Sequence, residues 1–331
     1  MRILLGFYSG IGDFVSALPC IREVSENSTN NLFVAVSEQN RDLIEMLNLK
    51  NVTFIYFSLF SFKNLQDSIF FLFTLIGCKL DIILFSPHPQ DNFTSWKLPI
   101  LGRILKFIRP SLELIGTSGD KNSYFYTKKI LINKQNLLIT REILFFKAVE
   151  LISCNFDVDT TSIFDIENKE IKNELVINPG ASKKLRLWNI NNYISLCEEI
   201  LNLDDKIIIR FIGLEHELID IKNKIHNVRV LFETGNLNRM IMVVNEAKCI
   251  ITMDSGFSHI AGILNKPHIA IFGSANPNLT RPLSENSHIL YKQQLDCQPC
   301  NAHVCKLVNN ECMDLITSKD VIIEMKRLKI I

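Results

Sequence analysis

One stretch in the second half of the chain decides the fold: residues 249–262, which read CIITMDSGFSHIAG. Its first part, Cys249 to Met253, is apolar and rich in isoleucine, which is typical of a strand buried on both faces of a parallel sheet. A helix-like run follows almost at once. A buried strand that feeds a helix predicts an α/β fold.

The junction between that strand and that helix is a candidate ligand site. We expect Asp254 or Ser255 to cap the helix, Gly256 to let a ligand approach the backbone, and His259 to project from the first turn. Free N–H groups and the helix dipole suit a phosphate or diphosphate there. The pattern also fits an ordinary strand–helix turn with a packed histidine.

Composition bounds the class of protein. The chain has 331 residues, of which 47% are hydrophobic and 21% charged, so we expect a globular protein with two domains. A formal net charge of +1 argues against a nucleic-acid partner.

Two apolar segments do not predict membrane insertion. Residues 2–8 predict a first strand rather than a signal peptide, because Gly10 and Gly12 interrupt the run without a cleavage site. Residues 68–77 predict a buried helix that is too short to span a bilayer. We therefore expect a cytoplasmic protein.

The first strand leads through Gly10 and Gly12 into a helix that begins at Asp13 and is broken or bent at Pro19. The loop lacks the third glycine of a dinucleotide fingerprint. Asp13 fits a helix cap, and it also fits a carboxylate at the end of a strand where ligands of α/β folds gather.

Residues 96–110 interleave four cations with large apolar side chains, which predicts a helix. Such a helix fits contact with anionic lipid headgroups, and it also fits a core helix whose cations reach out to solvent.

The second half repeats strand and helix with more regularity, and a loop with charged or small residues follows each strand. Ser182, Lys184 and Arg186 follow one strand, Glu217 the next, and Asp254 a later one. Since these loops share one edge of a parallel sheet, they can converge on one ligand. Basic side chains there suit phosphate, and Glu217 suits sugar hydroxyls, although a solvated loop and a first-turn acid fit as well. We expect Trp188 to pack rather than to stack on a ligand.

Nine cysteines fall into two groups. Five lie in apolar surroundings and predict core positions in a reducing compartment: Cys20, Cys78, Cys154, Cys197 and Cys249. The other four, Cys297, Cys300, Cys305 and Cys312, have a spacing that suits a structural zinc or iron site, with His303 able to replace one thiolate. A closed thiolate shell would stiffen a loop and leave no open position for catalysis.

Taken together, these motifs resemble glycosyltransferase family 9, the bacterial ADP-heptose:lipopolysaccharide heptosyltransferases. The matching segments are residues 9–13 (SGIGD) with Leu18-Pro19, residues 178–182 (NPGAS) with Arg186 and Trp188, residues 254–261 (DSGFSHIA), Lys266-Pro267, Phe272-Gly273 and the four-cysteine tail.

The resemblance implies a GT-B fold, in which two Rossmann-like α/β domains with parallel sheets face a central cleft. We expect an acceptor-binding domain over residues 1–165 and a nucleotide-sugar domain with the four-cysteine insertion over residues 166–316. A helix at 317–331 is expected to cross back to the first domain.

The resemblance also implies an inverting transferase that moves a heptose from ADP-heptose to a hydroxyl of a lipopolysaccharide-type acceptor. Asp13 would be the general base, with Gly10 and Gly12 in the acceptor-side loop, and no cofactor would be required for transfer. The donor would contact the following residues: Ser182, Lys184, Arg186, Glu217, Asp254, Ser255, Gly256 and His259. The family pattern has a lysine where this chain has Arg186.

Other assignments stay open at this point. The acceptor could be a protein of the autotransporter type, and the chain could instead be a GT-B sugar-nucleotide epimerase or a non-catalytic nucleotide-sugar binding protein. Peripheral contact with the inner face of the inner membrane fits the cationic segment at 96–110.

Overall fold

The computed structural model describes residues 1–8, 10–26, 30–57, 65–85, 97–118, 123–133, 135–152, 163–167, 169–300, 302, 304–307 and 310–331. The chain forms two compact units, Met1–Asp165 and Ile166–Ile331. Ser9, Cys154 and His303, which the sequence analysis named, lie outside the described residues.

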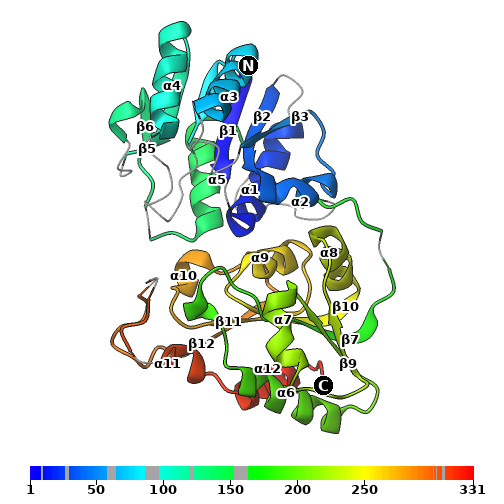
Figure 1. Cartoon of the computed structure of the whole chain (residues 1–331). Coiled ribbons are helices and arrows are strands. Elements are labelled where there is room, and N and C mark those ends of the chain that lie inside the picture. The colour runs from blue at the N-terminus through cyan, green and yellow to red at the C-terminus, as the bar shows by residue number, and fades with distance from the viewer. Residues whose placement is uncertain are drawn as a thin grey trace. The chain divides into compact units, whose positions relative to one another are not determined.

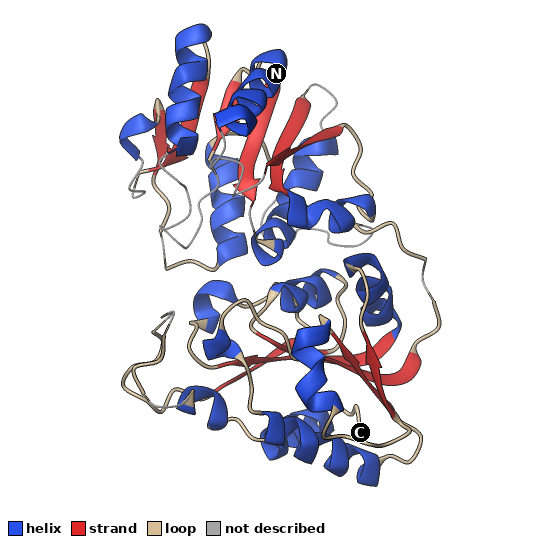
Figure 2. Cartoon of the chain, viewed as in Figure 1, coloured by secondary structure: helices blue, strands red, loops and turns tan. Residues whose placement is uncertain are grey.

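The first unit is built on a sheet of parallel strands in the order β3-β2-β1-β4-β5-β6. Figures 1 and 2 show helices on both faces of this sheet. Its elements are β1 (Arg2–Tyr8), α1 (Ile11–Glu26), β2 (Asn31–Ser37), α2 (Arg41–Glu45), β3 (Val52–Phe57), α3 (Leu65–Gly77), β4 (Ile82–Leu84), α4 (Lys97–Ile108), β5 (Glu113–Thr117), β6 (Lys128–Ile130) and α5 (Leu138–Ala148).

The second unit has a sheet of the same kind, in the order β12-β11-β10-β7-β8-β9. Its elements are β7 (Lys172–Asn178), α6 (Ile190–Leu203), β8 (Ile208–Ile212), α7 (Glu215–Lys222), β9 (Val230–Glu233), α8 (Leu237–Glu246), β10 (Ala247–Met253), α9 (Gly256–Ile263), β11 (His268–Phe272), α10 (Pro277–Thr280), β12 (Ser287–Tyr291), α11 (Glu311–Asp314) and α12 (Ser318–Arg327).

Both sheets have the doubly wound strand order of the Rossmann fold, and the α/β class predicted from the sequence is confirmed. In each sheet the strand order reverses between the first and fourth strands of its unit, that is, between β1 and β4 and between β7 and β10. Ligands of open α/β sheets bind beyond the carboxyl ends of strands at such a reversal. The loops after β1, β7 and β10 are therefore the places to examine for function.

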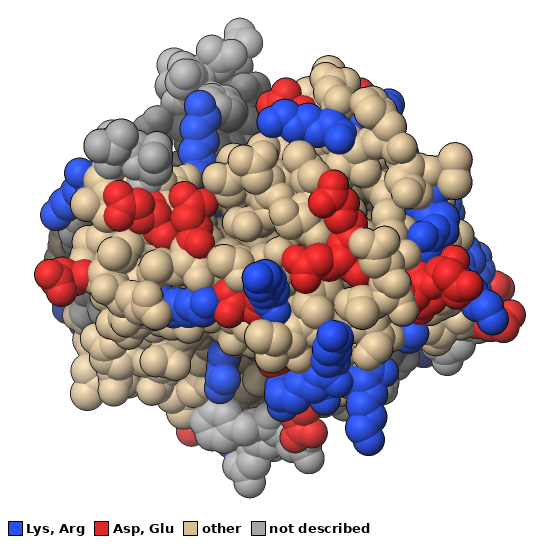
Figure 3. Space-filling model, turned by 90° about the horizontal axis from the view of Figure 1, so that it is seen from below, with Lys and Arg blue, Asp and Glu red and all other residues tan. Residues whose placement is uncertain are grey.

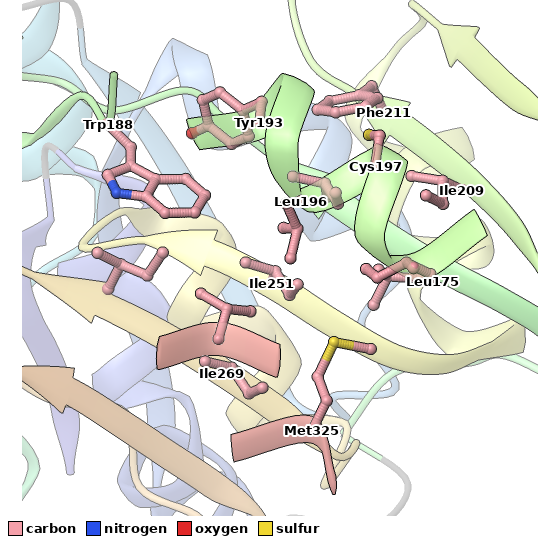
Figure 4. Packing of buried hydrophobic residues seen from close by; sticks show 14 of the residues in the cluster. Leu175, Trp188, Tyr193, Leu196, Cys197, Ile209, Phe211, Ile251, Ile269 and Met325 are labelled. Atoms are coloured by element: carbon pink, nitrogen blue, oxygen red, sulfur yellow. The ribbon is translucent and has the colours of Figure 1, made fainter. Parts of the chain in front are cut away.

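The isoleucine-rich strands of the second unit are buried on both faces, as their composition predicts. Cys249 and Ile251 of β10 contact α6 and α12 in one core cluster, whereas Ile250 packs with α8 and α9 in another. Figure 4 shows Trp188 and Tyr193 over the same core, where Trp188 donates its indole N–H to the carbonyl oxygen of Ile316 over 2.7 Å. Trp188 therefore packs, as the sequence analysis expected.

Several elements differ from the sequence expectations. Helix α1 continues through Pro19 rather than breaking there, and β5, β6 and β12 are strands that the periodicity did not reveal. Within the second unit, helix α12 packs on α6, where Ser318 Oγ donates to Glu199 over 2.8 Å; its expected return to the first domain stays a prediction.

The segment expected to be a buried helix forms α3, but one of its faces is open. Phe70 is 76% exposed and Phe73 is 66% exposed. Within the described residues, none of the helices combines the length and hydropathy needed to span a membrane.

The surface carries both signs of charge. Figure 3 shows Lys and Arg interspersed with Asp and Glu over one face of the molecule, in keeping with a formal net charge of +1.

Candidate functional site

The loops after β7 and β10 meet in a buried ion pair. Arg186, in the basic loop (residues 182–186) that follows β7, places Nε 3.1 Å from Oδ2 of Asp254, the residue that follows β10. Its Nη1 also donates to the backbone carbonyl of Asp254 over 3.3 Å. The Arg186 side chain is 13% exposed and that of Asp254 only 5%. Both contacts come from one planar guanidinium whose donor directions are fixed, so the arginine in this chain holds the loop in a defined orientation, which a freely rotating ammonium group would do less well.

The site around the Arg186–Asp254 ion pair has a net positive charge, because Lys183 lies beside the pair. Burial, and then the nearby Arg186, lower the pKa of Lys183, while Asp254 acts in the opposite direction. Burial raises the pKa of Asp254, against the effect of Arg186 and Lys183. Two cations thus surround one carboxylate at the reversal of the sheet, an arrangement that attracts an anion.

The start of α9 lies directly after Asp254. The expectation that Asp254 or Ser255 caps this helix through its side chain is not met: Ser255 is the N-cap residue, but its side chain makes no cap hydrogen bond, and Asp254 is committed to Arg186. The buried Oγ of Ser255 has no hydrogen-bond partner among the described residues. Helix N–H groups therefore remain available beside the two cations, which favours a phosphate ligand.

Glu217 lies between two glycines at the neighbouring strand ends. Its Oε2 accepts a hydrogen bond from the Leu214 N–H over 2.8 Å and so stabilises the start of α7. A Cβ on Gly213 would lie 2.8 Å from that same oxygen, and a Cβ on Gly180 would overlap the carboxylate. Both glycines are required because the carboxylate fills the space of their missing side chains.

The other residues that the sequence analysis expected to contact the sugar-nucleotide donor lie on the basic loop and at the start of α9. Ser182 and Lys184 are exposed on the basic loop, and Gly256 and His259 belong to the first turn of α9. His259 lies close enough to the buried His268 to help lower its pKa to about 3, a shift caused mainly by burial.

The sequence analysis did not list Lys183 among the donor-contacting residues, although Lys183 lies on the same basic loop as Ser182, Lys184 and Arg186. It also passed over Asn178, whose buried side chain donates to the Ile212 carbonyl over 2.9 Å and ties the end of β7 to β8. The signal for both was their position at a strand's carboxyl end, next to residues that were named.

In the first unit, Asp13 lies in the first turn of α1, directly after the loop that follows β1. Its Oδ2 would be 2.7 Å from a Cβ on Gly10, so this glycine is needed for the carboxylate to fold back over the loop. Gly12 accepts a hydrogen bond from Ser16 Oγ over 2.8 Å, within the same turn. Asp13 is partly exposed and lies at a reversal of strand order, which is where a general base for a bound hydroxyl is useful.

The four cysteines of the tail line one cavity. Cys297, Cys300, Cys305 and Cys312 line a small cavity of about 20 Å³, and Leu185 of the basic loop lines it too. Among the described residues, no disulfide joins these four side chains. Burial, and then the three neighbouring thiols, raise the pKa of Cys312 to about 11.

The four-cysteine loop (residues 297–312) is fastened to the strand ends. The buried Gln298 donates from Nε2 to the Gly273 carbonyl over 2.9 Å, and the Cys300 N–H donates to the Ser274 carbonyl over 3.0 Å. Asn310 Nδ2 donates to the carbonyl of Lys184 over 2.8 Å, so the loop also contacts the basic loop. In the part of the chain that the structure describes, no group of three or more His, Cys, Asp or Glu is already arranged around a metal position.

Known proteins share this architecture and sequence. The family model for glycosyltransferase family 9 (heptosyltransferase) matches residues 110–310. A lipooligosaccharide heptosyltransferase 2 from Campylobacter jejuni is 26% identical over 297 residues, which cover 81% of this chain and 90% of the relative.

Two solved structures from Escherichia coli share the fold. A heptosyltransferase with ADP has a TM-score of 0.76 at 17% identity, with 99% of each chain covered. The ADP-heptose lps heptosyltransferase II has a TM-score of 0.71 at 16% identity, with 99% of this chain and 98% of that one covered. The two doubly wound sheets form a GT-B fold. With the family model covering more than half of its length, the chain belongs to glycosyltransferase family 9 and is a glycosyltransferase.

Proposed function

We propose that this enzyme transfers a heptose from ADP-heptose to a hydroxyl of a lipopolysaccharide-type acceptor, with inversion at the anomeric carbon. The observation that carries the proposal is the pairing of Arg186 with Asp254 beside Lys183 and the uncapped start of α9. That arrangement suits a diphosphate. The heptosyltransferase names of the family and of the Campylobacter relative supply the sugar and the acceptor class.

In the proposed reaction, the acceptor oxygen attacks the anomeric carbon of the donor while its proton passes to the carboxylate of Asp13. The bond between the anomeric carbon and the β-phosphate oxygen breaks, and ADP leaves with the electron pair. A positioned general base of this kind contributes about 10²- to 10⁴-fold to the rate.

The leaving diphosphate gains negative charge as that bond breaks. In this proposal, Lys183, Arg186 and the N–H groups at the start of α9 stabilise that charge, and transfer requires no metal ion. Asp254 orients Arg186 rather than contacting the phosphate, because its Oδ2 and its carbonyl oxygen both face the guanidinium. Ser182 and Lys184 add contacts from the exposed side of the loop, and the Glu217 carboxylate suits a hydroxyl of the nucleoside or sugar.

The alternatives raised by the sequence are less well supported. A sugar-nucleotide epimerase and a non-catalytic binding protein do not fit membership of a transferase family. A protein acceptor has no observation of its own in favour of it, whereas the lipooligosaccharide relative favours a saccharide acceptor.

The proposed acceptor indicates where in the cell the enzyme acts. A lipid-linked saccharide is presented at a bilayer surface, so we propose a cytoplasmic enzyme that makes peripheral contact with the inner face of the inner membrane.

We also propose that Cys297, Cys300, Cys305 and Cys312 hold a structural zinc or iron ion. The support is that all four thiols line one cavity and that thiolates are the ligands these metals favour. A bound metal would rigidify the loop that contacts Lys184. Elemental analysis of freshly purified protein tests this: one zinc or iron per chain, lost in a Cys297→Ser/Cys300→Ser variant, supports the site, and protein free of both metals contradicts it.

Incubation of the protein with ADP-heptose and heptose-deficient lipopolysaccharide tests the transfer itself. We expect heptosylated product and ADP from the wild type, and a loss of at least about 10²-fold in kcat for Asp13→Asn, which keeps the size of the side chain against Gly10 but removes the base. Asp42→Asn in the first turn of α2 is the matched control and should keep full activity. Free heptose without product would indicate an epimerase or hydrolase, and binding without turnover would contradict catalysis.

A further inference from the structure

We propose that the outer face of α3 and α4 docks on an anionic lipid bilayer. This α3–α4 face consists of six large apolar side chains that are exposed in the first unit: Ile69, Phe70, Phe73, Ile104, Phe107 and Ile108. Helix α4 lies in the cationic segment at residues 96–110 that the sequence analysis singled out, and α3 adds a second helix to the surface.

Helices α3 and α4 pack on the same core, and both also expose apolar side chains. Phe71 and Leu75 of α3 and Leu101 and Leu105 of α4 are buried in one core cluster, together with strands of the sheet. Both helices therefore cover the same face of the sheet, where Figure 1 shows them as neighbours. At 100° per residue, Ile69 and Phe73 of α3 and Phe107 of α4 lie on the sides of their helices that turn away from this core, and Ile108 is exposed at the end of α4.

The phenylalanine side chains of this face are far more exposed to solvent than is usual for phenylalanine in a folded protein. Phe107 is 89% exposed, Phe70 is 76% and Phe73 is 66%. Scattered exposed apolar residues are ordinary, but a contiguous group on two adjacent helices marks an interaction surface. Phenylalanine and isoleucine on a helix face suit insertion at the boundary between headgroups and acyl chains.

The positive charge beside the α3–α4 face indicates an anionic partner. Helix α4 carries Lys97, Arg103 and Lys106 and no acidic residue, and α3 carries one acid, Asp67, whereas the whole chain has a net charge of only +1. Arg103 is exposed on α4 next to Ile104. Lys106 donates to the carbonyls of Pro110 and Leu112 and so stays at the end of α4 near Phe107. Cations beside an apolar helix face favour anionic headgroups.

A second copy of this chain fits the surface less well. A twofold dimer places the same surface patch against itself, so the cationic segments of the two copies would lie opposite each other and repel. An anionic bilayer takes up the apolar side chains and neutralises the cations at once.

The purpose of the contact rests on the proposed function, because a lipid-linked acceptor is reached at a bilayer. The contact itself can be measured without donor or acceptor. We expect the purified protein to float with phosphatidylcholine vesicles that contain phosphatidylglycerol, and to float much less with pure phosphatidylcholine. In 1 M salt we expect weaker binding, because salt screens the cations.

The decisive variant is Phe73→Ser/Phe107→Ser. Each lost phenyl group should lower the partition coefficient about tenfold. Arg103→Glu should weaken flotation through charge alone. The matched control Val228→Ser/Ile323→Ser replaces two apolar residues that are 94% and 65% exposed in the second unit, and it should float like the wild type.

Two acceptors separate this inference from the proposed function. With a soluble, delipidated core oligosaccharide, Phe73→Ser/Phe107→Ser should transfer heptose as fast as the wild type; with the acceptor embedded in vesicles, it should be slower by at least tenfold. Transfer that fails on both acceptors in the wild type contradicts the proposed function and leaves the flotation result standing. Flotation unaffected by the double variant, or a concentration-dependent dimer in sedimentation that the variant abolishes, overturns the lipid proposal.

Discussion

At the scale of single residues, Arg186 is the most informative side chain. Its two contacts to Asp254 orient the guanidinium at the edge where a diphosphate would bind. We expect Arg186→Lys to raise the KM for the sugar nucleotide about tenfold or more, because a charge-assisted hydrogen bond is worth about 1.5–3 kcal/mol and the ammonium cannot replace the fork.

Steady-state kinetics with varied donor measure this effect. Arg239→Lys is the matched control, since Arg239 also pairs with a carboxylate but lies on α8 with its side chain 51% exposed. Equal KM values for Arg186→Lys and the wild type would show that the guanidinium fork is not needed to bind the donor.

Lys183 predicts a pH dependence. Because burial and Arg186 lower its pKa from the usual 10.5, it loses its proton at a lower pH than an ordinary lysine, and its attraction for a diphosphate is lost as the pH rises. We expect kcat/KM for the donor to fall on the alkaline side, at a pH below 10.5. In Lys183→Arg the fall should move to higher pH, since a guanidinium keeps its proton. An identical alkaline limb in both proteins would rule out Lys183 as its source.

Sequence reasoning found most of the individual residues of this site but not their partners. Arg186 and Asp254 were both named, yet they are separated by 68 positions, and nothing in either local pattern indicates that one side chain orients the other. The expected cap at α9 failed for the same reason: an aspartate before a helix is a good cap only when no cation competes for it.

At the scale of secondary-structure elements, α12 shows how the second unit is closed. Its Val321, Ile322 and Met325 belong to the core cluster of β7 and β10, and the segment just before it accepts the indole N–H of Trp188. We expect Trp188→Phe to lower the free energy of unfolding by about 1–3 kcal/mol, because the carbonyl of Ile316 loses its shorter hydrogen bond and keeps only the 3.5 Å bond from Asn192 Nδ2.

Thermal or denaturant unfolding checks that value. Leu187→Ala, at the exposed neighbouring position, should change stability by less than about 0.5 kcal/mol. A Trp188→Phe protein as stable as the wild type would mean that the hydrogen bond contributes nothing.

The regular strands and helices were predictable because the spacing of apolar residues along each element reflects which of its side chains are buried. The first strand expected at residues 2–8 is β1, and the strand expected at 249–253 forms most of β10. Strands β5, β6 and β12 were not evident, because short strands near the edge of a sheet carry few alternating residues. The open face of α3 was also not evident, since a helix that is apolar all round looks the same whether one side faces the core or a partner.

At the scale of the whole molecule, each unit has its own sheet and its own hydrophobic core. We expect a fragment of residues 166–331 to unfold in one cooperative transition, because its strands and α12 complete a core without the other unit. Its melting temperature should rise with ADP, since a ligand that binds only the folded state stabilises it. Calorimetry with and without ADP tests both points, and an Arg186→Ala fragment should lose the shift. A fragment that melts without cooperativity would contradict the independence of this core.

The identical strand order of the two sheets has a consequence for recombination within the family. Since each unit brings its own reversal of strand order and its own loops to that edge, a crossover between residues 165 and 166 leaves every sheet whole. Chimeras that join residues 1–165 of this protein to the second half of a relative should therefore remain folded. They should inherit acceptor choice from one parent and sugar-nucleotide choice from the other.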